Sequence, residues 1–122
     1  MLDHISIQAT DMAKATGFYD TVLATLGGKR ILDFGEAVGY GVDFPSFWVG
    51  AQTTGEGFRE SHIAFTAPNR AAVRDFFDAA MRFGTESLHG PRVWPEYHEH
   101  YYGAFVRDPD GNNVEACCHT PE

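Results

Sequence analysis

The sequence predicts an α+β domain built from two βαβββ modules. Three observations predict this fold: an internal repeat, an alternating strand followed by an amphipathic stretch in each copy, and several short β-rich segments after each stretch. Sliding the chain by 58 positions places residues 4–20 over residues 62–78, and six of the 17 aligned positions are identical. Two copies are too few for a solenoid, so the repeat indicates a duplicated half-domain.

The first copy begins with a strand and a helix. Ile5, Ile7 and Ala9 alternate with polar residues, which is the two-residue period of a strand with two unlike faces. Thr10 or Asp11 is expected to cap a helix. Its apolar positions recur at spacings of three and four: Ala15, Phe18, Tyr19, Val22 and Leu26. Two glycines end this helix, and β-rich segments follow at residues 29–34, 37–43 and 47–51.

The second copy repeats this order. Ile63, Phe65 and Ala67 alternate as a strand, Asn69 caps the next helix, and Gly84 ends it. The helix has an apolar stripe formed by Val73, Phe76, Phe77, Ala80 and Met81. A looser stretch covers residues 85–100, and two strands are expected at residues 101–107 and 113–119. The Asp-Pro-Asp-Gly-Asn sequence between them is typical of a hairpin turn.

Length and charge narrow the class of protein. At 122 residues the chain predicts one domain, with one module at about residues 1–53, a Gly- and Thr-rich linker at residues 52–58, and a second module at about residues 59–119. The net charge of −8 disfavours binding to nucleic acid or to anionic membranes. No apolar run approaches the length of a membrane span, and the first residues show no signal sequence, so a cytoplasmic protein is expected.

Three side chains are candidate metal ligands. His4 and His62 occupy equivalent positions of the repeat, each on the strand face opposite the apolar residues. Glu115 alternates with Val114 and Ala116 on the last strand, so it also belongs to the face away from the core. If the two modules curve around a shared cleft, two imidazoles and a carboxylate converge there and suit Fe(II), Mn, Ni, Co or Zn. The structural alternative is that each histidine is a hydrogen-bonded strand residue.

A dense aromatic and imidazole segment precedes the last hairpin. Residues 94–102 are expected to border the cleft, where Tyr97, His98, His100 and Tyr102 are candidates for acid–base catalysis and for stacking on a planar substrate. Trp48 and Trp94 are candidate pocket residues. The alternative for this segment is a rigid surface loop that covers the cleft or a dimer contact.

Several motifs together resemble the vicinal oxygen chelate superfamily, which includes glyoxalase I, extradiol dioxygenases, fosfomycin-resistance enzymes and bleomycin-resistance proteins. These motifs are the His-Ile-Ser-Ile opening, the first helix, the strand beginning at His62, and the final turn followed by Glu115. The resemblance implies a glyoxalase-like fold in which a curved mixed sheet surrounds a metal cleft, and commonly a homodimer. It also implies that His4, His62 and Glu115 are the metal ligands.

Departures from the family pattern reduce the number of activities that the resemblance implies. Glyoxalase I has a further acidic or amide ligand on its fourth strand, where this chain has Trp48 and its neighbours, and an arginine where this chain has Gln8. The extradiol enzymes have a tyrosine where this chain has Phe105. A typical glyoxalase I is therefore not expected, and dioxygenase activity is disfavoured.

The resulting hypothesis is an enzyme that binds one divalent metal and acts on a small oxygenated organic molecule held through two oxygens, by lyase, isomerase or dioxygenase chemistry. The alternative from another class is a protein that sequesters a small molecule or drug, as in bleomycin resistance. A third is a scaffold without a small-molecule role. The fold alone does not choose between them.

Overall fold

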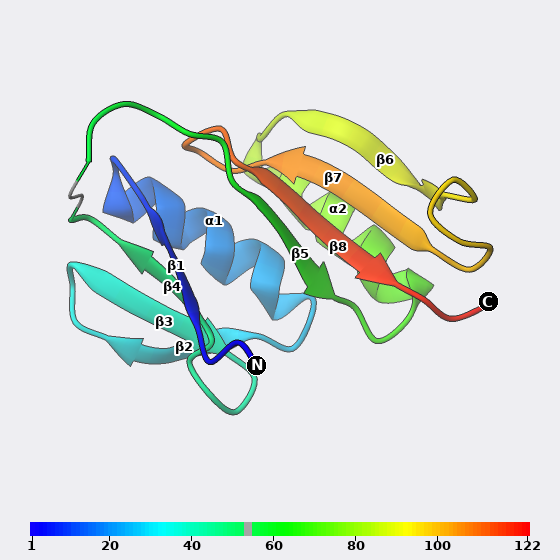
Figure 1. Cartoon of the computed structure of the whole chain (residues 1–122), viewed down its shortest axis with the longest axis horizontal. Coiled ribbons are helices and arrows are strands. Elements are labelled where there is room, and N and C mark those ends of the chain that lie inside the picture. Colours follow the sequence, from blue (N-terminus) through cyan, green and yellow to red (C-terminus); the bar gives the residue numbers. More distant parts are fainter. Residues whose placement is uncertain (53–54) are drawn as a thin grey trace.

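The computed structural model, which describes residues 1–52 and 55–122, confirms the duplicated βαβββ order (Figure 1). The first module contains β1 (Ile5–Gln8), α1 (Met12–Ala24), β2 (Lys29–Asp33), β3 (Ala37–Gly41) and β4 (Phe47–Gly50). The second contains β5 (His62–Thr66), α2 (Arg70–Phe83), β6 (Ser87–Val93), β7 (Tyr102–Arg107) and β8 (Asn113–Cys118). The expected first-module boundary at residue 53 lies outside the described residues.

Each module forms its own four-stranded mixed sheet. The strand orders are β1-β4-β3-β2 and β5-β8-β7-β6, so the first and last strands of each module pair in parallel and the others pair as antiparallel hairpins. Within the described part of the chain the two sheets are separate, and β1 and β5 each form a sheet edge. The sequence repeat thus appears as two copies of one topology.

The helices begin and end at the residues that their chemistry favours. Asp11, one of the two predicted caps, accepts a hydrogen bond from the Lys14 backbone N–H at 3.0 Å. Asn69 accepts the corresponding bond from Ala72 at 2.8 Å. Such caps satisfy amide groups that the first turn of a helix leaves unpaired. Gly84 ends α2 with a φ of 97°, a left-handed conformation that favours glycine.

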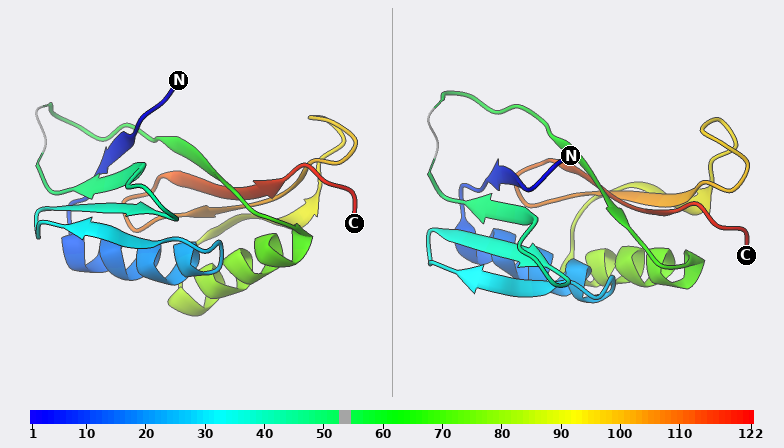
Figure 2. Two further views of the ribbon diagram at one scale, coloured as in Figure 1. Left: turned by 90° about the horizontal axis from the view of Figure 1, so that it is seen from below. Right: turned by 60° about the horizontal axis from the view of Figure 1, so that its bottom comes forward.

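Both helices lie on the same side of the sheets (Figure 2). The buried core therefore combines the apolar faces of α1 and α2 with alternate residues of the strands, and one cluster spans both modules. Val38, Tyr40 and Val49 face α1, whereas Val114 and Ala116 face the second helix. The opposite face of each sheet, which carries no helix, is called the open face below.

Polar contacts also join the two modules beneath this core. The hydroxyl of Tyr19 on α1 donates to the Asp108 carboxylate of the β7–β8 turn at 2.7 Å, and both residues are buried. Burial, followed by the negative charge of Asp108, raises the pKa of Tyr19. Thr10 donates through its backbone and its hydroxyl to Asp110, at 3.0 and 2.8 Å. The final hairpin turn therefore also holds the modules together.

Among the described residues, no helix is long and apolar enough to span a bilayer. Cys117 and Cys118 are both free thiols. Their side chains point to opposite faces of β8, as expected for neighbours in a strand.

Candidate metal-binding site on the second sheet

The open face of the second sheet carries a row of side chains across four strands. Ala64 of β5 pairs with Glu115 of β8, which pairs with Phe105 of β7, which in turn pairs with His89 of β6. Residues opposite one another in neighbouring strands project to the same face. The ring of His62, two residues before Ala64, stacks on Phe105 with centroids 6.0 Å apart. The site is thus built on a rigid sheet.

Two of the three predicted metal ligands meet in this row. Nε2 of His62 lies 3.1 Å from Oε1 of Glu115. Glu115 is only 1% exposed, whereas half of the His62 side chain, 51%, faces solvent. A buried carboxylate is costly unless it is paired and hydrogen-bonded, so its placement beside an accessible imidazole indicates a polar site with a route to the solvent.

The second oxygen of Glu115 is bound by a residue that the sequence analysis did not select. The hydroxyl of Tyr101 donates a short hydrogen bond to Oε2 of Glu115. Burial, then the hydrogen bond to Glu115, raises the pKa of the Tyr101 hydroxyl, which keeps it protonated as a donor. Strand alternation was the missed signal, because Tyr101 shares the parity of Gly103 and Phe105 and hence the face of Glu115.

His4 does not join this pair within one chain. It precedes β1 at the N-terminus, more than half of its side chain is exposed, and its Nδ1 lies 2.7 Å from the Asp3 carboxylate. Within residues 1–52 and 55–122, no three His, Cys, Asp or Glu side chains gather as a metal site. The expected convergence of three donors inside one chain is therefore not observed. The physical reason is that the edge strands β1 and β5 belong to separate sheets instead of lining one cleft.

The aromatic segment before β7 packs partly under the site and partly beside it. Trp94 is buried, its indole N–H donates to the Gly103 carbonyl at 3.0 Å, and its ring contacts Phe105. Tyr97 is exposed and stacks on Trp94 with centroids 5.7 Å apart. Trp94 therefore supports the floor of the row, whereas Tyr97 lies on the outside.

His98 of this segment lies near the C-terminal end of β8, beyond Glu115. Nε2 of His98 and Nδ1 of His119 share a hydrogen bond at 2.7 Å, and Nε2 of His119 lies 4.0 Å from Sγ of Cys117. The ring of Tyr101 contacts both histidine rings edge-on. His100 is part-exposed and lies 3.3 Å from the Glu99 carboxylate. Tyr101 thus contacts both His98 and Glu115, whereas the His100 ring pairs with Glu99.

Tyr102 lies on the opposite face of β7. Its ring lies under the guanidinium of Arg70, at 5.0 Å, and its hydroxyl accepts a hydrogen bond from Arg74 at 3.4 Å. Both arginines belong to α2. The structure therefore places this candidate on the helix side of the sheet, away from Glu115.

Trp48 occupies the open face of the first sheet. Its indole lies flat over Gly39, where a Cβ would be 2.8 Å from two ring carbons, and its Nε1 donates to the Pro45 carbonyl at 2.9 Å. Phe34 is 69% exposed and stacks parallel to it, with centroids 6.1 Å apart. At this position the first sheet thus presents an aromatic surface.

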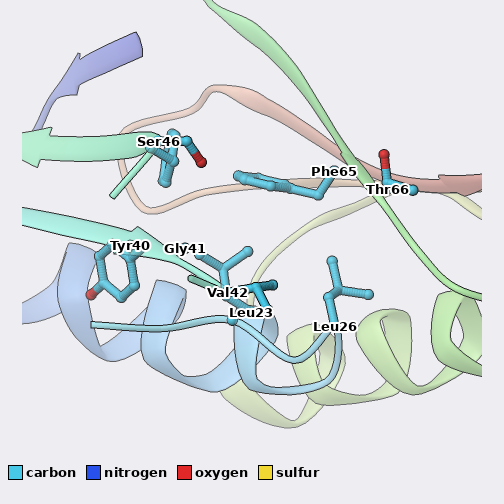
Figure 3. A pocket seen from close by; sticks show the side chains of 10 residues that line it. Leu23, Leu26, Tyr40, Gly41, Val42, Ser46, Phe65 and Thr66 are labelled. Atoms are coloured by element: carbon cyan, nitrogen blue, oxygen red, sulfur yellow. The ribbon is translucent and has the colours of Figure 1, made fainter. Parts of the chain in front are cut away.

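Two pockets lie away from the pair formed by His62 and Glu115. An apolar pocket of about 260 Å³ opens between the modules, where Phe65 of β5 faces Leu26 and Val42 (Figure 3). A larger polar hollow of about 490 Å³ lies beside β1, where Ser6 and Gln8 form part of its lining. Neither pocket includes a candidate metal ligand of the second sheet.

Comparisons with known proteins agree on the fold and the family. No curated protein matches the sequence significantly. A glyoxalase/bleomycin resistance protein from Albidiferax ferrireducens is similar in structure, with a TM-score of 0.82 and 24% identity over 94% of this chain and 96% of that one. A lactoylglutathione lyase from Agrobacterium tumefaciens has a TM-score of 0.72 and 20% identity, and the match covers 96% of this chain and 92% of that one. The fosfomycin resistance protein FosX from Mesorhizobium loti has a TM-score of 0.70 and 15% identity, and the match covers 98% of this chain and 92% of that one.

At these identities the structural matches establish the fold. The sequence carries the family assignment, because the family model described as Glyoxalase/Bleomycin resistance protein/Dioxygenase superfamily matches residues 1–116, nearly the whole chain. This chain belongs to the glyoxalase/bleomycin resistance protein/dioxygenase superfamily.

Proposed function

We propose that the protein is a metal-dependent enzyme that transforms a small oxygenated organic molecule, and that His62 and Glu115 supply two of its metal ligands. The observation that carries this proposal is the 3.1 Å approach of an accessible imidazole nitrogen to a fully buried carboxylate on the open face. Burying an acidic side chain on a sheet costs stability, and a cation bound there would offset that cost.

The donor set fits a divalent ion of the Fe, Mn, Ni, Co or Zn type. Imidazole nitrogen and carboxylate oxygen are ordinary ligands for these ions, at bond lengths of about 2.0–2.2 Å. Two neighbouring ligands at such lengths lie roughly 3 Å apart, close to the separation of His62 Nε2 and Glu115 Oε1. When bound, the ion would supply Lewis-acid polarisation of two adjacent substrate oxygens.

The chain's own residues prepare the site around that ion. Phe105 lies beside Glu115 and packs against Trp94, so one side of the site is apolar while the His62 side stays open to solvent. Among the loop candidates, His98 is assigned to proton movement at the edge of the site, where its Nε2 shares a hydrogen bond with Nδ1 of His119. Tyr97 and His100 lie nearer the solvent and are assigned to substrate contact at the rim.

We assign the third ligand to His4 of a second copy. His4 is exposed and remote from the pair in its own chain, and both β1 and β5 leave one edge of their sheets unpaired in the described structure. Unpaired edges are natural places for two chains to join. In a symmetric homodimer, the first module of each copy then faces the second module of the other, and two equivalent sites result. We expect this dimer in the cytoplasm.

One observation favours the alternative function, the sequestration of a small molecule or drug. The stacked Phe34 and Trp48 present an exposed aromatic surface on the first sheet, which suits retention of a flat apolar ligand without chemistry. The two functions differ in their need for metal. Turnover of a substrate that requires added metal would support the enzyme. Tight binding of a small molecule whose affinity is the same with and without metal would support sequestration.

Metal analysis of the purified protein and of His62→Ala tests the proposal. The wild type is expected to retain about one transition metal ion per chain after incubation and dialysis, and the variant is expected to lose it, because it keeps only two of the three protein ligands. His89→Ala is the matched control, since His89 lies on the same face, on β6, and its ring packs against the Phe105 and Trp94 rings. Equal metal content in the wild type and in His62→Ala would reject the assignment.

A further inference from the structure

We propose that Tyr101 is a positioning residue for the metal ligand Glu115: its hydroxyl binds Oε2 and thereby leaves Oε1, on the His62 side, as the single coordinating oxygen. This inference rests on the proposed metal site. It assigns a role to a side chain that neither touches the ion nor belongs to the predicted ligand set.

The two oxygens of Glu115 have different partners, and this difference carries the inference. Oε1 lies 3.1 Å from Nε2 of His62, whereas Oε2 accepts the hydrogen bond of Tyr101. A carboxylate can hold a metal through one oxygen or through both. A phenol bound to one of them competes with the metal for that oxygen and restricts the rotation of the carboxylate about its last bond.

The surroundings of Oε2 leave the carboxylate little freedom to turn. A Cβ built on Gly103 would lie 3.1 Å from Oε2 and 3.2 Å from a ring carbon of Tyr101. Glycine at this position of β7 therefore provides the space in which the carboxylate and the phenol meet. A side chain there would push at least one of the two away.

Tyr101 is itself held on both sides by the loop before β7. Its carbonyl accepts a hydrogen bond from the Trp94 N–H at 2.7 Å, and its own N–H donates to the His98 carbonyl at 3.2 Å. The rings of Tyr97 and His119 contact the Tyr101 ring edge-on, with centroids 4.9 Å away in each case. The phenol is thus fixed before any ligand arrives, as a group that orients a metal ligand must be.

Phe105, the direct strand neighbour of Glu115, cannot supply the hydroxyl that binds Oε2. Phe105 pairs directly with Glu115 across β7 and β8, yet it has no polar atom to offer the carboxylate. The Phe105 ring packs against the rings of His62, His89 and Trp94. Tyr101 reaches the same carboxylate from just before the start of β7, on the same face of the strand.

The test compares metal binding by Tyr101→Phe and by Tyr102→Phe, which loses the neighbouring phenol on the helix side of β7. Titration with Co(II) gives the dissociation constant and the visible d–d spectrum of each protein. Tyr101→Phe is expected to bind Co(II) about 10- to 100-fold more weakly, the range typical for loss of a group that orients a ligand. Its saturated spectrum is expected to weaken, because a freed Oε2 raises the coordination number. Tyr102→Phe keeps the wild-type constant and spectrum.

Gly103→Ala provides a second variant that disturbs the same contact without deleting the hydroxyl, and it is expected to weaken Co(II) binding as well. Wild-type affinity and spectrum in a folded Tyr101→Phe would overturn this inference while the metal site itself stands. Failure of the wild type to bind Co(II) would overturn the inference and the proposed function together. A purely structural role predicts lower thermal stability of Tyr101→Phe with an unchanged spectrum, and that result also rejects the proposal.

Discussion

Trp48 holds in the first sheet the position that Glu115 holds in the second. Ser6 pairs with Trp48 in the parallel pair of β1 and β4, and Ala64, 58 residues further along, pairs with Glu115 in the parallel pair of β5 and β8. The duplicated fold thus carries a carboxylate at one of two equivalent positions and an indole at the other. This difference is consistent with a metal site of three protein ligands and an aromatic wall where a fourth would stand.

The close fit of this indole over Gly39 makes a first prediction. Gly39→Ala is expected to displace Trp48, because the new Cβ would lie 2.8 Å from the indole and 2.9 Å from Pro45. Such overpacking costs about 1–3 kcal/mol of folding free energy. Urea denaturation and tryptophan emission report the loss and the movement. Gly50→Ala, with no neighbour nearer than 3.8 Å on the same sheet, is the control and is expected to change little. Equal stability of the two variants would contradict the packing described.

The buried link between modules makes a second prediction. Tyr19→Phe leaves the Asp108 carboxylate without its phenolic donor and is expected to lower the free energy of unfolding by about 1–3 kcal/mol. Thr10→Val removes only the exposed hydroxyl bond from Thr10 to Asp110 and leaves the backbone N–H bond in place, so it is expected to cost only about 0.5 kcal/mol. Chemical denaturation of both variants measures the difference. The account of the junction fails if the two losses are equal.

The ion pair between Asp20 and Arg30 makes a third prediction, which concerns pH. Two hydrogen bonds from Arg30, at 2.8 and 2.7 Å, lower the pKa of Asp20, and Tyr40 donates a third. Because the folded-state pKa is depressed, the stabilisation is complete above the ordinary aspartate pKa of about 3.9 and is lost as the pH falls through the folded value. Solvent screening of this part-exposed carboxylate limits the effect to about 1 kcal/mol.

Asp20→Asn is therefore expected to be less stable than the wild type at pH 7, with the gap narrowing when the measurement is repeated in acid, below the depressed folded-state pKa of Asp20. Urea denaturation at the two pH values measures the gap. A gap of the same size at both values would show that charge at Asp20 contributes nothing.

Local patterns in the sequence were sufficient to predict each module. The repeat, the helix caps at Asp11 and Asn69, and the turn before β8 are consequences of nearby residues, and the structure contains all of them. The approach of His62 to Glu115 follows from strand parity and the parallel pairing of β5 with β8, both of which a repeated module implies.

The remaining features depend on how distant elements pack. The sequence pattern predicts His4 beside His62 if the two modules curve around a shared cleft, and within the described part of the chain the two sheets are separate. The placement of the modules involves a shared core and the bond between Tyr19 and Asp108, contacts between distant segments that no local pattern encodes. Tyr101 was passed over in favour of Tyr102, although strand alternation alone distinguishes the face of one from the face of the other.

Mixing two inactive variants tests most directly the claim that His62 and Glu115 share a metal with His4 of a second copy. His4→Ala and His62→Ala are each expected to bind no metal, but refolding them together places all three donors in one of the two sites of every mixed dimer. Random pairing then restores about a quarter of the wild-type metal content. A mixture of His62→Ala with Glu115→Gln, whose defects lie in the same half of the site, restores none. Full metal content in His4→Ala alone, or no recovery in the first mixture, would contradict the shared site.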